Sequence, residues 1–213
     1  MSDSKAAVNA EILDGVGVLT IRDPERHNAL DLRMWRQLSA AIERFGNDPS
    51  MRAVVLTGGG YHDFATGTPD WEWALPAFEA LTTCPQAVIA RIRGDCLGSG
   101  LALALAADIR VAATDCAFGF PLERDPQPLP QAVLDRLVAL VGPGQAARLL
   151  LTGVRIESDE ALRIGLVESV IGDIGLADAI AEIANTLSET AAGFVIAAKR
   201  GIARAISAAP PAA

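Results

Sequence analysis

Two glycine-punctuated segments hold the residues of this sequence that are best suited to chemistry. The first reads Phe-Ala-Thr-Gly-Thr-Pro-Asp over residues 64–70, and the second reads Gly-Asp-Cys-Leu-Gly-Ser-Gly over residues 94–100. Glycines at turns between a strand and a helix let the backbone approach a ligand and leave N–H groups free to donate hydrogen bonds. Two such turns could direct two N–H groups at one oxygen that becomes negative during a reaction. Either segment alone is equally compatible with an ordinary tight turn.

Apolar runs precede both segments and predict the strands that position them. Residues 53–57 and 87–92 are almost entirely apolar, which is typical of strands covered on both faces. The second segment continues into residues 99–107, a run without a polar face that predicts a buried helix. Residues 71–81 predict a helix after the first segment.

The rest of the chain alternates between predicted strands and predicted helices. The further helices are predicted over residues 29–45, 131–141, 145–151, 161–164, 176–187 and 192–206, and the further strands over 16–21, 109–113, 116–120 and 166–171. This alternation predicts an α/β domain. We predict a core over residues 1–172 and a short helical tail over residues 173–213.

Length and charge limit the classes of partner. A chain of 213 residues suits one domain. Its formal net charge of −8 argues against nucleic acids and anionic membranes as main partners, although a few local arginines could still bind an anionic small molecule. The apolar runs are far shorter than the ~20 residues that a membrane span needs.

The three cysteines indicate a reducing compartment. Cys84, Cys96 and Cys116 have no spacing typical of metal ligands, so no metal site is predicted. Their odd number, and a start without an apolar leader, favour reduced thiols in the cytoplasm. We expect each of them to be a small buried apolar residue.

The order of the motifs resembles that of the crotonase superfamily, also called the enoyl-CoA hydratase/isomerase superfamily. The similar stretches are Asp-Pro-Glu-Arg-His-Asn-Ala-Leu at 23–30, Val-Val-Leu-Thr-Gly at 54–58, the turns at 64–67 and 94–100, Ala-Asp-Ile-Arg at 107–110, Phe-Gly-Phe-Pro at 118–121, Leu-Thr-Gly at 151–153 and Gly-Leu-Val at 165–167. No single stretch is specific, and their shared order carries the resemblance. It implies a crotonase-like spiral of ββα units that assembles as a homotrimer or hexamer, with the helical tail related to trimerisation.

The resemblance also implies a substrate held as a coenzyme A thioester, with no separate cofactor. The thioester carbonyl would lie between the backbone N–H groups of Thr68 and Ser99, which form an oxyanion hole. Pro69 restricts Thr68 to extended conformations, which would fix the first N–H. Ser99 begins a predicted buried helix, whose positive end favours an enolate oxygen. The family usually has glycine where this chain has Ser99, but only the backbone N–H is needed.

Further substrate contacts follow from the resemblance. They are predicted at Arg26, His27, Ala29, Ala65, Gly67, Gly98 and Leu122. Arg26 lies where the family often has a basic residue near the coenzyme A phosphates, and an ordinary solvated loop arginine is an equally good interpretation. We expect Trp71, Trp73 and Leu122 to line part of an apolar acyl pocket.

The sequence departs from the family at the positions that hydration requires. Hydratases have one glutamate where this chain has Ala102 and a second where it has Leu122. Adding water across a double bond needs a base for the water and an acid for the α-carbon, and neither residue supplies them. Isomerisation, dehydration or decarboxylation needs only an enolate and one proton carrier.

Three carboxylates near the second missing glutamate are candidates for that carrier. They are Glu123, Asp125 and Asp135, which are equally well described as solvated loop charges. A non-catalytic thioester-binding or accessory subunit with a crotonase fold is the alternative to an enzyme. The missing acids, a short segment over residues 70–85 and an early end to the tail favour that alternative. A plain α/β domain unrelated to coenzyme A would leave the motif order unexplained.

Overall fold

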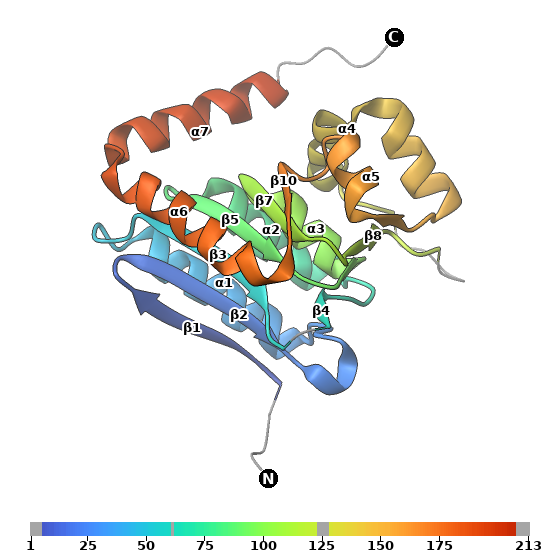
Figure 1. The fold of residues 1–213 in the computed structure, drawn as a ribbon, viewed down its shortest axis with the longest axis horizontal. Helices are drawn as coiled ribbons and strands as arrows, with labels where there is room; N and C mark the ends of the chain where they lie inside the picture. The colour runs from blue at the N-terminus through green and yellow to red at the C-terminus, as the bar shows by residue number, and fades with distance from the viewer. Residues whose placement is uncertain (1–5, 61, 123–127, 208–213) are drawn as a thin grey trace.

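Two sheets form the framework of the protein in a computed structural model that describes residues 6–60, 62–122 and 128–207 (Figure 1). Among these residues, the main sheet holds β1 (Ala7–Leu13), β2 (Val16–Arg22), β3 (Ala53–Gly58), β5 (Ala87–Ile92), β7 (Ile109–Ala113) and β10 (Ser169–Ile171), in that order. The smaller sheet holds β4 (Asp63–Ala65), β6 (Asp95–Leu97), β8 (Ala117–Gly119) and β9 (Ile156–Glu157). The predicted α/β architecture is confirmed.

The chain repeats one unit of two strands and a helix. In each unit the first strand joins the main sheet, the second joins the smaller sheet, and a helix follows. The units are β3–β4 with α2 (Trp71–Thr83), β5–β6 with α3 (Ser99–Ala106), and β7–β8 with α4 (Gln131–Thr152). Equivalent strands of successive units pair in parallel, so each unit lies beside the one before it. This repeat is the predicted spiral of ββα units.

Local sequence signals set the limits of the helices. Helix α1 (Leu32–Gly46) begins where the Asp31 carboxylate accepts a hydrogen bond of 2.8 Å from the Met34 N–H. This cap starts the helix later than the residue 29 that periodicity alone predicts. In α4, Gly142 has a φ of 74° and breaks the helical path, as the Gly-Pro-Gly stretch predicts.

Strand β1 was not predicted, and neither were the short strands β4, β6 and β9 of the smaller sheet. Strand β1 pairs antiparallel with β2 through a tight turn at Asp14 and Gly15, both of which have positive φ. An Asp-Gly pair between two strands is a strong hairpin signal. The strand itself is mostly exposed or half-buried, so it lacks the apolar run by which the central strands are recognised.

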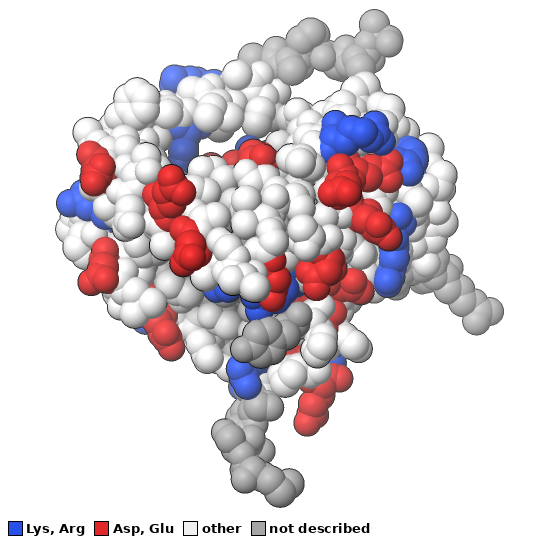
Figure 2. Space-filling model, in the orientation of Figure 1, with Lys and Arg blue, Asp and Glu red and all other residues white. Residues whose placement is uncertain are grey.

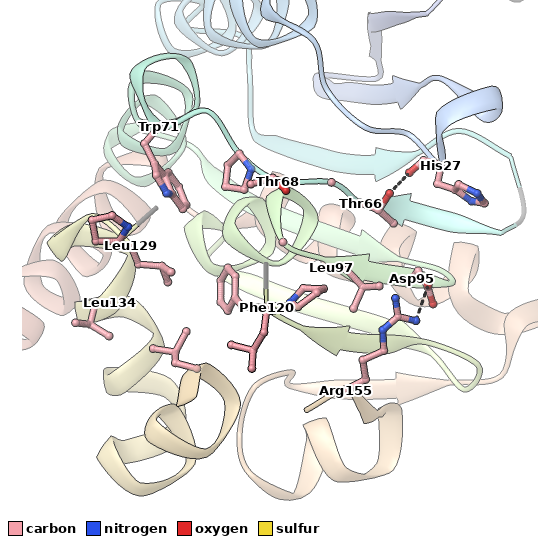
Figure 3. A pocket seen from close by; sticks show the side chains of 17 residues that line it. His27, Thr66, Thr68, Trp71, Asp95, Leu97, Phe120, Leu129, Leu134 and Arg155 are labelled. Atoms are coloured by element: carbon pink, nitrogen blue, oxygen red, sulfur yellow. Dashed lines mark hydrogen bonds and ion pairs between the residues drawn. The ribbon is translucent and has the colours of Figure 1, made fainter. Parts of the chain in front are cut away.

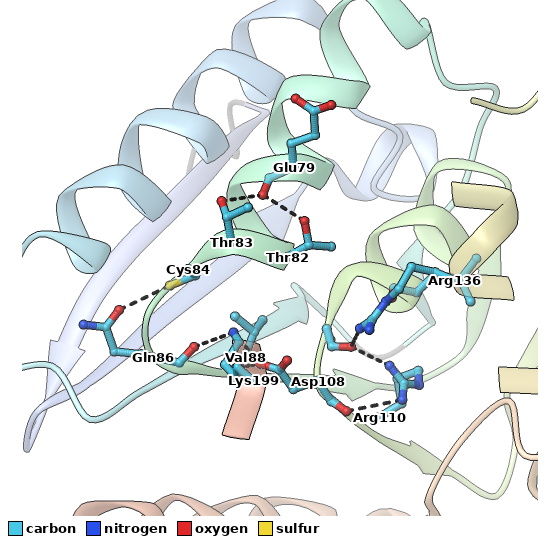
Figure 4. A network of polar contacts seen from close by, with 12 residues as sticks. Glu79, Thr82, Thr83, Cys84, Gln86, Val88, Asp108, Arg110, Arg136 and Lys199 are labelled. Carbon is cyan, nitrogen blue, oxygen red and sulfur yellow. Dashed lines mark hydrogen bonds and ion pairs between the residues drawn. The ribbon is translucent and has the colours of Figure 1, made fainter. Parts of the chain in front are cut away.

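Helix α3 is fixed at its carboxyl end by the buried Arg110 and the half-buried Arg136 (Figure 4). Arg110 donates from Nη1 to the Ala107 carbonyl oxygen at 2.6 Å and from Nε to the Leu166 carbonyl oxygen at 3.0 Å, and it pairs with Glu168. Arg136 donates from Nη2 to the same Ala107 oxygen at 2.8 Å, and burial lowers its pKa. The guanidinium groups satisfy carbonyls that the helix leaves unpaired at its negative end.

The chain ends in two helices, α6 (Leu176–Glu189) and α7 (Ala192–Ser207). Helix α6 packs on β3, β5 and β7, whereas α7 makes its main contact with these strands at β5 and also contacts α4 (Figure 1). The link to trimerisation stays a prediction, as does a domain boundary at residue 172. Among the described residues, no helix combines the length and apolar character needed to cross a bilayer.

Charges are mixed on the surface shown in Figure 2. On that face, acidic and basic side chains alternate over the described residues instead of gathering into one basic patch. Nucleic-acid-binding surfaces usually gather their basic side chains in one region.

Candidate active site

A cavity of about 760 Å³ lies where the two glycine turns meet, between β6 and the helices α2 and α4 (Figure 3). The first turn contributes Gly67 and Thr68 to its wall, and the second contributes Leu97 and Gly98. Both turns follow the second strand of their ββα unit, and β4 and β6 pair in parallel. The repeat therefore brings two segments that are thirty residues apart in the sequence to one cavity.

The two turns touch through their backbones. Gly98 has a φ of 54°, and a Cβ atom there would lie 2.3 Å from the Gly67 carbonyl oxygen. Gly67 has a φ of 96°, and a Cβ atom there would lie 3.2 Å from the Ala29 Cβ. Contacts this close leave no space for a methyl group at Gly98. The glycines are thus needed for backbone approach, as the sequence indicates.

The Ser99 N–H bonds to the neighbouring turn. It donates to the Gly67 carbonyl oxygen at 2.8 Å, and the Ser99 hydroxyl donates to the same oxygen at 2.9 Å. The Gly67 carbonyl and the Thr68 N–H belong to one planar trans peptide and point in opposite directions. The Thr68 N–H therefore points away from Ser99 in this structure. An arrangement with both N–H groups on one oxygen stays a proposal.

One end of the cavity is apolar. Its wall includes Trp71, Phe120 and Leu134, together with Leu122, which packs against Gly153. A Cβ atom at Gly153 would lie 2.5 Å from the Leu122 Cγ, so this glycine makes room for the leucine. Trp71 and Leu122 line the cavity as predicted.

The prediction that Trp73 lines the cavity is wrong. Trp73 faces α1, where the Arg36 guanidinium carbon lies 4.8 Å from its ring centroid. Residues two apart on a helix project to different sides, so Trp71 and Trp73 cannot both face one cavity. The guanidinium over the ring makes a cation–π contact that links α1 to α2.

The other end of the cavity is polar. His27, Asp95 and Arg155 lie there, and an Arg155 Nη1 atom lies 3.6 Å from an Asp95 carboxylate oxygen. The His27 ring is largely exposed, and its Nδ1 hydrogen-bonds with Asp63 at 3.0 Å. Among the described residues of the wall, these three carry the side chains that can be charged.

Several predicted site residues lie away from the cavity wall. Arg26 is exposed and lies 4.0 Å from Asp23, which is the contact of a loop arginine. Ala29 packs behind Gly67, and Ala65 is fully buried beneath the turn. Asp135 is exposed and accepts a hydrogen bond from Gln131 on the same helix. The remaining two candidates for the proton carrier, Glu123 and Asp125, lie outside the described residues.

Sequence reasoning missed Asp95 and Arg155. Asp95 belongs to a segment that was interpreted only as a glycine turn, and the structure shows a short strand there. Because side chains alternate along a strand, Asp95 and Leu97 face the cavity while Cys96 is fully buried. Arg155 follows the Leu-Thr-Gly stretch and has no pattern of its own that would have revealed it.

The cysteines lie outside the candidate chemistry. All three are buried and unbridged, as predicted. Burial raises the pKa of Cys84 and Cys96, and it raises the pKa of Cys116 to about 11. A thiol with a raised pKa is a poor source of the thiolate needed for nucleophilic attack.

Comparison with known proteins agrees with this architecture. A family model described as enoyl-CoA hydratase/isomerase matches residues 11–213. The chain belongs to this family. Membership in the enoyl-CoA hydratase/isomerase family confirms the crotonase fold predicted from the motif order. It also places the chain among proteins that process acyl-CoA.

Family members named for different reactions resemble the chain to a similar degree. It is 33% identical over 203 residues to the short-chain-enoyl-CoA hydratase of Clostridium acetobutylicum, covering 89% of this chain and 78% of that protein. It is 32% identical over 201 residues to the carnitinyl-CoA dehydratase of Citrobacter koseri, covering 88% and 77%. A monofunctional enoyl CoA isomerase from M. smegmatis superposes with a TM-score of 0.86 at 30% identity, covering 95% of each chain.

Proposed function

We propose that this protein is an enzyme that acts on an acyl-CoA thioester through a stabilised enolate. The observation that carries the proposal is that both glycine turns line a single cavity with an apolar end, in a chain of the enoyl-CoA hydratase/isomerase family. The acyl group would occupy the apolar end beside Trp71 and Leu134. The thioester carbonyl would lie at the turns.

The oxyanion hole would form by a rotation of one peptide. Turning the Gly67–Thr68 peptide would move the Gly67 carbonyl away from Ser99 and aim the Thr68 N–H toward it. The thioester oxygen would then replace that carbonyl between the two N–H groups. Glycine at position 67 permits the change in backbone angles at little cost. Ser99 begins α3, so the positive end of that helix adds to the stabilisation of the enolate.

Isomerisation, dehydration or decarboxylation fits the residues better than ordinary hydration. Ala102 and Leu122 stand where the resemblance places the two glutamates of hydratases. Hydration would need two acid–base groups, whereas the other reactions need an enolate and one proton carrier. We propose Asp125 or Glu123 as that carrier. Full turnover by the Asp125→Asn and Glu123→Gln variants, singly and combined, would exclude both.

Calorimetric titration tests the proposal directly. The protein is titrated with acetyl-CoA and with a coenzyme A thioester analogue that mimics the enolate. We expect the mimic to bind at least about tenfold more tightly, because catalysis requires preferential binding of the transition state. Equal affinities would contradict an enolate-stabilising enzyme and indicate a thioester-binding subunit. Absence of binding by both compounds would overturn the proposed function altogether.

A further inference from the structure

The polar end of the cavity contains an acidic and a basic side chain that face each other. Asp95 lies at the start of β6, and Arg155 lies directly before β9 (Figure 3). The closest nitrogen and oxygen atoms of the pair are 3.6 Å apart, beyond an ordinary hydrogen bond. The side chains are 37% and 58% exposed, so both can reach a ligand in the cavity.

Neighbouring polar groups at this end already have partners. The Thr66 hydroxyl donates to the His27 carbonyl oxygen at 3.1 Å, and the His27 ring bonds with Asp63. By contrast, no side-chain hydrogen bond joins Asp95 or Arg155 to another residue within the described chain. The donors of Arg155 and the acceptors of Asp95 are therefore the hydrogen-bonding groups that this end offers to a ligand.

The charges of the pair select the kind of group that it can bind. Arg155 would attract a carboxylate or phosphate, but the adjacent Asp95 carboxylate would repel it. A cation would be attracted by Asp95 and repelled by Arg155. A neutral group with an acceptor and a donor side by side suits both residues, because its oxygen can accept from Arg155 while its N–H donates to Asp95. An amide is such a group.

The position of the pair in the cavity indicates which part of a bound thioester lies beside it. Asp95 is three residues before Gly98 along β6, so the two Cα atoms are about 10 Å apart. We therefore assign Asp95 no part in moving a proton on the α-carbon, which would lie beside Gly98 and Ser99. Figure 3 shows the pair on one side of Thr68 and the apolar end, with Trp71 and Leu134, on the other.

We infer that Asp95 and Arg155 bind an amide of the thiol-bearing arm of coenzyme A and so determine specificity for the carrier. The inference rests on the proposed function, which puts the acyl group at the apolar end and directs the arm toward the polar end. The arm contains two amides, and its remaining length would leave the cavity beside the exposed Arg155. The pair takes no part in the chemical step.

Binding of amide-modified ligands tests the inference. The titrants are acetyl-CoA and two analogues in which one or the other amide N–H is replaced by an ester oxygen. We expect one analogue to bind the unmodified protein about tenfold more weakly, because a hydrogen bond to a charged group is lost. Asp95→Ala should bind acetyl-CoA and that analogue equally, at the weaker affinity. Arg155→Met should weaken the binding of all three compounds.

Matched substitutions on α5 (Ser158–Arg163) serve as controls. Asp159→Ala and Arg163→Met remove exposed charges of the same types away from the cavity and should leave all affinities unchanged. If Asp95→Ala keeps the preference for the amide, the inference is wrong while the proposed function stands. If Asp95→Ala instead changes the affinity for a thioester whose acyl group ends in an amide, the pair lies at the acyl end of the cavity. That result would also overturn the inference. If the unmodified protein binds none of the compounds, both proposals fail.

Discussion

Helices α3 and α7 differ in how strictly the rest of the protein fixes them. All eight residues of α3 are buried, and both of its ends are held, by the contact with Gly67 at one end and by Arg110 and Arg136 at the other. No described side chain of α7 is buried, and Phe194 is 68% exposed. An ion pair between Lys199 and Asp108 ties α7 to the sheet, with 2.6 Å between Nζ and Oδ2.

The difference shows where the fold controls the candidate chemistry. Helix α3 starts at the turn that would hold the thioester oxygen, so any movement of the helix moves a proposed hydrogen-bond donor. None of the described residues of α7 lies in the wall of the cavity. Substitutions in α3 and its anchors should therefore alter both stability and ligand binding, whereas substitutions in α7 should alter stability alone.

The largest effect is expected from Arg110→Met. The change removes the buried guanidinium from the end of α3, so the Leu166 carbonyl oxygen loses its Arg110 donor and the Ala107 carbonyl oxygen keeps only Arg136. A buried acceptor left without its donor costs about 1–3 kcal/mol, and Arg110 donates to several buried carbonyls, so we expect a loss of about 3–5 kcal/mol of unfolding free energy. Urea unfolding followed by circular dichroism measures the loss, with Arg200→Met on the exposed side of α7 as the control. A loss no larger than that of the control would show that α3 is not anchored by Arg110.

The next largest effect is expected at the other end of α3, from Gly98→Ala. The added Cβ would lie 2.3 Å from the Gly67 carbonyl oxygen, so the two turns must separate. Loss of an oxyanion donor reduces rates by about 100- to 1000-fold. We expect a decrease of that size in kcat/KM on any accepted acyl-CoA and a matching loss of affinity for the enolate mimic. Unchanged binding of the mimic would show that the second turn does not contribute to the proposed oxyanion hole.

How far the sequence predicts the molecule can be judged at these same residues. The glycines at 67 and 98 were recognisable because turns with positive φ restrict residue type so strongly. Strands β3 and β5 were recognisable because full burial makes them uniformly apolar. Helix α3 was recognisable for the same reason. Residue type therefore predicted the fold where burial or backbone geometry leaves few choices.

The site was less predictable because side-chain direction depends on tertiary packing. The Ser99 N–H was expected to face the ligand, but in the structure it donates to the Gly67 carbonyl oxygen, thirty-two residues away in the sequence. Asp95 belongs to the second ββα unit and Arg155 follows the last one, and only the pairing of β6, β8 and β9 brings them together. Trp73 looked equivalent to Trp71 in the sequence, and helix geometry separates them.

A smaller effect is expected from Lys199→Met in α7. The change removes the ion pair with Asp108 and the hydrogen bond of 2.7 Å from Nζ to the Gln86 carbonyl oxygen. The pair is partly buried, so we expect a loss of about 1–2 kcal/mol, between the values for exposed and buried charged contacts. Hydrogen exchange should show faster opening of α7 and unchanged protection of α3. Equal loss of protection in both helices would contradict their independence, and Arg200→Met is again the control.

The smallest effect, and the only one of opposite sign, is expected from Gly201→Ala. Both helices contain an internal glycine, but only the one in α3 has a neighbour that requires it. A Cβ at Gly100 would lie 2.0 Å from the Ala65 carbonyl oxygen, whereas a Cβ at Gly201 would have no atom within 4 Å. Alanine at 201 should therefore stabilise the protein by about 0.5–1 kcal/mol through helix propensity, and leave thioester binding unchanged. Thermal unfolding of Gly100→Ala and Gly201→Ala side by side measures the contrast. Destabilisation by Gly201→Ala would mean that α7 is packed as closely as α3, and the distinction between the two helices would fail.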